Sequence, residues 1–180
     1  MFTHCTPVNS ASGEVLLGTA LIKVLSPEGL ELSVKSLIDP CSQSSFISES
    51  LCQSLRLKGM KVHAPISGIG GEVVALGKKI GSFKLQPHVS SNYEHQLEAL
   101  VLPQVSSYTS PSLVIKKKCN HLKGLQLADP QLLNHSHVNA LLGSAFYYII
   151  VDGAVIKGAP SEPITIKTML DWIICGNTIG

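Results

Sequence analysis

Short apolar runs separated by turn-forming residues extend along most of this chain. Residues 15–25 and 30–38 are rich in β-branched and apolar residues and flank Ser-Pro-Glu-Gly at 26–29, so they predict a β-hairpin. Residues 61–66 and 72–76 flank a glycine-rich stretch and predict a second hairpin. Further strands are expected at residues 79–85, 97–102, 138–142, 146–151, 155–156, 164–166 and 169–174.

One short helix interrupts this β-type pattern. Ser48 is a residue type that caps helix N-termini, and Ile47, Leu51 and Leu55 recur at i, i+4 and i+8, so they lie on one helical face. Many short strands with Gly and Pro turns and almost no helix are typical of a mostly-β barrel or sandwich with one or two short helices.

The length of 180 residues fits one domain. Residues 1–13 are polar, small and without period, and predict an N-terminal linker. We expect the folded domain at 14–176 and a short tail at 177–180. Residues 103–130 contain Ser, Thr, Pro and Lys without periodicity and are long for a loop, so they predict a loop insertion within the domain.

Composition excludes several classes of protein. An apolar content of 44% with 14% charged residues argues against disorder. The net charge is +2 and the only basic cluster is at 116–118, so no nucleic-acid binding is expected. The longest apolar run, 140–151, is too short to span a bilayer, and the N-terminus lacks the features of a signal peptide. We therefore expect an intracellular protein that does not contact membranes.

The five cysteines are widely spaced and form no C-x-x-C pair, which favours free thiols in a reducing compartment. Cys119 and His121, followed by His135 and His137, have side chains that can bind metals, but their spacing matches no standard zinc pattern. We therefore expect no metal and no other cofactor.

Three segments offer candidate chemistry. The apolar run 36–38 leads into a tight turn that begins with Asp39, and a second apolar run leaves that turn. Of the four aspartates, only Asp39 has this context, although an Asp before Pro at a strand end is also an ordinary turn former. The glycines of 66–71 lack the spacing of a phosphate loop and suit a hairpin tip, flexible or merely tight. Leu141-Leu142-Gly143 reads as a core strand with a close backbone approach at the glycine.

The order of these three segments resembles that of retropepsin-type aspartic proteases: an active-site turn, a glycine-rich flap and a hydrophobic-hydrophobic-Gly segment. The residues are most similar to the peptidase domain of BEL/Pao-type LTR retrotransposons, which also ends in a Trp-containing strand like 170–176. The resemblance extends over about 14–176. It implies a closed acid-protease barrel, with Asp39 as the catalytic residue. It also implies substrate contacts at Ser42, Gln43, Ile66, Ser67, Gly68, Ile69, Gly70, Gly71, Leu142 and Gly143.

Aspartic proteases use two carboxylates that share one proton, because two like charges about 3 Å apart cannot both ionise. The chain offers one such turn, so the second carboxylate must be Asp39 of another copy, and we expect a homodimer. By resemblance, the substrate is the element's own polyprotein, cleaved in the cytoplasm or within virus-like particles.

Two positions depart from the family pattern. Where the family has Asp-Ser/Thr-Gly, this chain has Asp39-Pro40-Cys41, which removes a hydroxyl and adds a side chain. Where related elements often continue with Ala-Asp after the Leu-Leu-Gly segment, it has Ser144-Ala145. The alternative is therefore a catalytically degenerate domain that serves as a dimerisation or peptide-binding module. A third hypothesis is an unrelated β-barrel binding domain. A nucleophilic role of Cys41 is not indicated, because nothing in the sequence places a histidine near it to activate the thiol.

Overall fold

The computed structural model describes residues 15–68, 70–89, 91–109, 119–132, 134, 136–160 and 162–177. Within them the fold is mostly β, as predicted. The strands are β1 (Val15–Leu16), β2 (Thr19–Leu25), β3 (Glu31–Ile38), β4 (Phe46–Ser48), β5 (Met60–Ser67), β6 (Val73–Pro87), β7 (His95–Leu102), β8 (Val138–Leu142), β9 (Val151–Lys157), β10 (Ile164–Thr168) and β11 (Asp171–Asn177). The helices are α1 (Glu49–Ser54), α3 (Ser144–Ile150) and the 3-10 turn η1 (Asn120–Leu122).

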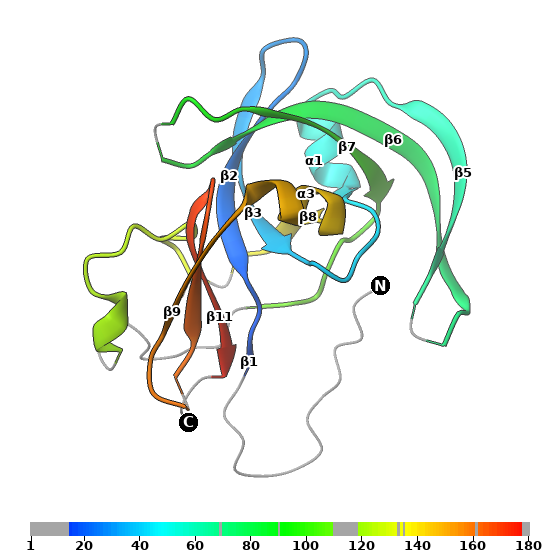
Figure 1. Cartoon of the computed structure of the whole chain (residues 1–180). Coiled ribbons are helices and arrows are strands. Elements are labelled where there is room, and N and C mark those ends of the chain that lie inside the picture. Colours follow the sequence, from blue (N-terminus) through cyan, green and yellow to red (C-terminus); the bar gives the residue numbers. More distant parts are fainter. Residues whose placement is uncertain are drawn as a thin grey trace.

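Six strands form a closed barrel, so the prediction of a β-barrel is confirmed. Their order is β2-β3-β8-β4-β7-β6, and pairing of β2 with β6 closes the circle (Figure 1). The main core lies inside and includes the fully buried Ile22, Ile47, Phe83, Leu85 and Leu142. A second cluster packs on the outer side of the β3, β8, β4 and β7 wall.

The first hairpin and the first helix form where the local pattern predicts them, except that residues 15–16 form the separate strand β1, which pairs with β11. Strands β2 and β3 pair antiparallel, from Thr19 opposite Leu37 to Leu25 opposite Glu31. At the start of α1 the Leu51 N–H donates to Ser48 Oγ at 3.2 Å, so Ser48 is the N-cap.

The second hairpin is longer than predicted. The strands expected at 72–76 and 79–85 are one strand, β6, which pairs in turn with β5, β7 and β2. The residues between them continue the strand, with Gly77 opposite Ala64 of β5. A Cβ on Gly77 would lie only 2.9 Å from a Leu100 methyl, so glycine allows this close packing. Strands β5 and β6 form the long curved hairpin on the right of Figure 1.

The prediction of a strand at 146–151 is wrong, because residues Ser144–Ile150 form helix α3. Aromatic and β-branched residues favour strands locally, but burial here follows the helical period. Phe146 and Ile150, four residues apart, are buried in the core, whereas Tyr148 and Ile149 are exposed. Packing therefore overrides local propensity in this segment.

A smaller sheet, in the order β1-β11-β10-β9, lies beside the barrel (lower left in Figure 1). The chain around Ala128 joins the two: the Leu21 N–H donates to Ala128 O and the Ala128 N–H donates to Trp172 O, both at 2.8 Å. This chain belongs to the predicted loop insertion, of which 110–118 lie outside the described residues. No helix in the described part of the chain is long and apolar enough to cross a membrane.

Candidate functional site

Asp39 directly follows strand β3 and begins the loop that leads to β4. Its backbone N–H donates to Leu142 O at 2.9 Å, which fixes the start of the loop to the end of β8. The Cys41 N–H donates to Asp39 Oδ1 at 3.0 Å, so the carboxylate has one defined orientation. Asp39 itself is half-buried, and Pro40 and Cys41 are exposed.

The loop from Asp39 crosses the end of β8. Strand β3 pairs parallel to β8, and β4 pairs antiparallel to β8 on its other side. The chain must therefore pass over the end of the strand between them. There the Ser144 N–H donates to Ser42 O at 2.7 Å, and the Gly143 N–H donates to Ser45 Oγ at 3.0 Å. The segment Leu141-Leu142-Gly143 therefore ends in direct contact with the loop that begins at Asp39.

Position 143 requires glycine because there is no room for a side chain. Its φ of −77° is open to any residue. A Cβ at this position would lie 2.6 Å from Ser44 O and 2.8 Å from Ser42 O, both backbone atoms. The predicted close backbone approach at Gly143 is confirmed, and it positions the loop that contains Asp39.

Other residues of the loop serve its own structure. The Ser42 hydroxyl donates to Ser44 O at 2.8 Å, so it is already engaged within the loop. Gln43 is exposed. Their predicted contacts with substrate stay predictions.

The glycine-rich segment is a hairpin tip between β5 and β6, as predicted. The Gly68 N–H donates to Glu72 O at 3.2 Å, and the Gly71 N–H donates to Gly68 O at 3.1 Å. Gly70 and Gly71 have φ values of 94° and 79°, which L-residues rarely adopt. Ser67, Gly70 and Gly71 are exposed, and Ile69 lies outside the described residues.

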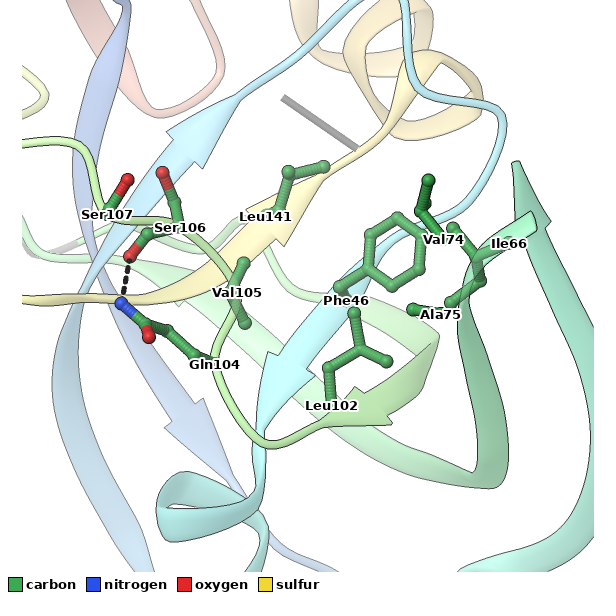
Figure 2. A pocket seen from close by; sticks show the side chains of 10 residues that line it. All are labelled: Phe46, Ile66, Val74, Ala75, Leu102, Gln104, Val105, Ser106, Ser107 and Leu141. Carbon is green, nitrogen blue, oxygen red and sulfur yellow. Dashed lines mark hydrogen bonds between the residues drawn. The ribbon is translucent and has the colours of Figure 1, made fainter. Parts of the chain in front are cut away.

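A cavity of about 270 Å³ opens between this hairpin and the outer face of the barrel. In Figure 2 the side chains of Phe46, Leu102 and Leu141 from the barrel face Val74 and Ala75 from the hairpin across the same space. The lining is mostly apolar and is formed by Phe46, Ile66, Val74, Ala75, Leu102, Gln104, Val105, Ser106, Ser107 and Leu141.

Of the predicted substrate residues that the structure describes, Ile66 alone lines this cavity. Leu142 points into the barrel and is fully buried, whereas its neighbour Leu141 faces the cavity, because successive side chains of a strand alternate between its faces. Sequence reasoning missed Phe46 and Leu102. For Leu102 the signal was the unbroken apolar run at 99–102, which indicates that both faces of this strand are covered. Strand β4 has only two apolar residues in a row, so it offered no such signal for Phe46.

Of the cysteines in the described residues, only Cys41 belongs to the loop that begins at Asp39, and it is exposed. Burial raises the pKa of the Cys175 thiol. Burial, and to a smaller extent the Glu162 carboxylate, raise the pKa of the Cys119 thiol. The cysteines in the described part of the chain are free, as predicted.

The structure also assembles a group of donors that sequence spacing did not predict. Cys119, His121 and Glu162 have donor atoms within 4.8 Å of one another. His137 is exposed and is not one of them, and His135 lies outside the described residues. The carboxylate comes from a distant hairpin turn, so no local pattern could have revealed it.

The chain matches no model of a known protein family, and no curated protein matches it. Its function is therefore inferred from the Asp39 loop, β8 and the hairpin of β5 and β6.

Proposed function

We propose that this chain is one half of a retropepsin-like aspartic endopeptidase, similar to the peptidases of BEL/Pao-type LTR retrotransposons. The observation that supports it best is the position of Asp39. This carboxylate begins a loop between two strands, β3 and β4, that flank a third, β8, and the loop packs directly on Gly143. A glycine-tipped hairpin occurs in the same chain, as a substrate-covering flap requires.

In this function Asp39 of each copy contributes one carboxyl group to a shared site. One carboxylate takes a proton from a water molecule, which attacks the peptide carbonyl, and the protonated partner donates to the developing oxyanion. The tetrahedral intermediate then collapses, the peptide C–N bond breaks, and the proton taken from the water passes to the leaving amine. The hydrogen bond from the Cys41 N–H orients Oδ1 for this task. Each chain supplies half of the dyad, so the active species is a homodimer.

The substrate is a polypeptide, and the element's own polyprotein is the one that the resemblance implies. The apolar cavity at Phe46, Leu102 and Leu141 suits a large apolar side chain of an extended segment that lies under the hairpin. Cleavage is expected near such residues.

The test of catalysis is Asp39→Asn. The amide keeps the size of the carboxyl group and its acceptor for the Cys41 N–H, but it cannot act as a base, so cleavage should be lost while the fold persists. Asp152→Asn, at an exposed position of β9, is the matched control and should cleave as the parent does. Peptide cleavage at mildly acidic pH, together with thermal unfolding, measures both effects. Equal cleavage by the parent and Asp39→Asn would disprove the proposal.

The test of assembly is sedimentation of the full chain at increasing concentration, with and without a statine-type peptide inhibitor. A dimer should form, and the inhibitor should favour it because the inhibitor binds only the complete site. A strict monomer under both conditions excludes the shared dyad.

One observation favours a second function, a catalytically degenerate module that binds peptides or dimerises. Pro40 has no hydroxyl to donate across a dimer, and the bond from the Cys41 N–H to Asp39 Oδ1 is also what an ordinary turn-holding aspartate makes. The double variant Pro40→Thr with Cys41→Gly discriminates between the two. An inactive parent that becomes active in the double variant indicates a degenerate peptidase, whereas equal activity of both shows that the parent turn is competent.

A further inference from the structure

Cys119, His121 and Glu162 meet where η1 contacts the turn between β9 and β10. The side chains of His121 and Glu162 are 11% and 16% exposed, and Cys119 is buried. This cluster lies at the smaller sheet, where Cys119 packs with Leu16 and Ile174. None of its members belongs to the Asp39 loop, the hairpin of β5 and β6 or the apolar cavity.

The hydrogen bonds of His121 assign its protons. Nε2 lies 2.9 Å from Pro163 O, and a carbonyl oxygen only accepts, so Nε2 bears the proton. In a neutral imidazole Nδ1 then carries a lone pair and can only accept. This lone pair faces Glu162 Oε2 at 3.3 Å. Two acceptors then face each other in a nearly buried site, an arrangement that needs a positive charge between them, either a proton or a metal ion.

Backbone groups hold both side chains in this orientation. The Ala159 N–H donates to Glu162 Oε2 at 2.9 Å, and Pro163 O holds the imidazole ring. Metal-binding histidines and carboxylates are usually oriented in this way by a second set of partners.

Gly158 makes room for the cluster. A Cβ on Gly158 would collide with both the His121 ring and the Glu162 carboxylate. The φ of Gly158 is not in the positive range that favours glycine, so glycine is needed here because a side chain would not fit and not because of backbone conformation.

The spacing of the donors fits a tetrahedral ion. Zinc binds nitrogen and oxygen at about 2.0 Å and thiolate sulfur at about 2.3 Å, so its neighbouring ligand atoms lie about 3.3–3.7 Å apart. His121 Nδ1 and Glu162 Oε2 already have this separation. All three donors lie within 4.8 Å of one another, so the other two separations exceed the tetrahedral spacing by at most about 1.5 Å.

We propose that Cys119, His121 and Glu162 bind a divalent zinc-class cation, with a fourth position open to water. A thiolate with an imidazole selects zinc over calcium or magnesium, which prefer oxygen ligands. The ion joins η1 to the turn between β9 and β10, and so fixes the end of the predicted loop insertion to the smaller sheet. This role is independent of peptidase activity.

The experiment is a titration of the full, metal-free chain with zinc chloride, followed by calorimetry and by thermal unfolding. One ion per chain should bind, with a dissociation constant below micromolar. Free zinc at about 100 times that constant should raise Tm by about 5–10 °C. Cobalt in place of zinc should give the absorption of a tetrahedral thiolate complex.

Variants assign the site. Cys119→Ser should abolish the cobalt–thiolate absorption, and Glu162→Gln should weaken zinc binding at least about tenfold, because the amide keeps the acceptor for Ala159 N–H but loses the charge. Cys41→Ser removes an exposed thiol elsewhere and should bind as the parent does, as should Asp39→Asn. The Asp39 control separates this proposal from the peptidase proposal.

Two outcomes overturn the proposal. If the parent chain binds no zinc stoichiometrically, the cluster is an imidazolium–carboxylate ion pair beside a buried thiol. If zinc binds but Glu162→Gln and Cys119→Ser bind it as tightly as the parent, the ion lies elsewhere. Both variants can be compared with the parent for folding by circular dichroism before titration.

Discussion

Replacing Gly143 by Ala tests the packing that positions Asp39. The added Cβ would lie 2.6 Å from Ser44 O and 2.8 Å from Ser42 O. These are backbone atoms, so the loop or the start of α3 must move. Neither can move freely, because the Ser144 N–H to Ser42 O bond of 2.7 Å and the Gly143 N–H to Ser45 Oγ bond of 3.0 Å join them.

The expected loss of stability follows from these contacts. Overpacking costs about 1–3 kcal/mol, and weakening one of these hydrogen bonds adds about 1 kcal/mol. The φ of −77° adds no strain for alanine. Gly143→Ala should therefore lower the free energy of unfolding by about 2–4 kcal/mol. For a chain of this size that corresponds to a fall in Tm of about 5–15 °C.

The assay is urea unfolding followed by circular dichroism and by the fluorescence of Trp172, the single tryptophan of the chain. The midpoint should fall by about 1–2 M. Gly81→Ala is the matched control, since its Cβ would meet only side-chain methyls of Ile47 and Leu57 at 3.4 Å. A Gly143→Ala variant as stable as Gly81→Ala would refute the close approach described for the loop.

Two further predictions concern charges inside the protein. Asp129→Asn should lower stability by about 3–5 kcal/mol in urea unfolding, because Lys35 Nζ lies 3.3 Å from Asp129 Oδ2 and both side chains are almost fully buried; a loss below about 1 kcal/mol, typical of surface pairs, would contradict this. Stability should also fall as the pH rises above about 8.5, because burial raises the pKa of Cys175 and Cys119, so the folded protein holds these protons more tightly than the unfolded chain. The two thiols stabilise the fold fully below their unfolded-state pKa, and this stabilisation is lost as the pH rises through their folded-state pKa. Urea midpoints that stay constant as the pH rises, or that fall equally in Cys175→Ser, would show that the Cys175 thiol does not contribute.

Local sequence determined the elements whose information is contained within a few residues. The turn at 26–29 and the runs beside it were sufficient for the first hairpin, and Ser48 with Leu51 and Leu55 was sufficient for α1. The glycines of 68–71 predicted a hairpin tip, because only glycine adopts the positive φ found at Gly70 and Gly71 without strain. The alternation of strands and turns was sufficient for a mostly-β fold.

Tertiary structure alone decided what depends on distant contacts. Phe146 and Ile150 became helical because one helical face could pack into the core, although their neighbours favour a strand. The pairing of Lys35 with Asp129, and of Cys119 and His121 with Glu162, joins residues that no periodicity relates. The place of Asp39 required both kinds of information. Its turn was visible in the sequence, but the loop crosses β8 only because β3 and β4 pair on opposite sides of that strand, and strand order is set by the packing of the whole barrel.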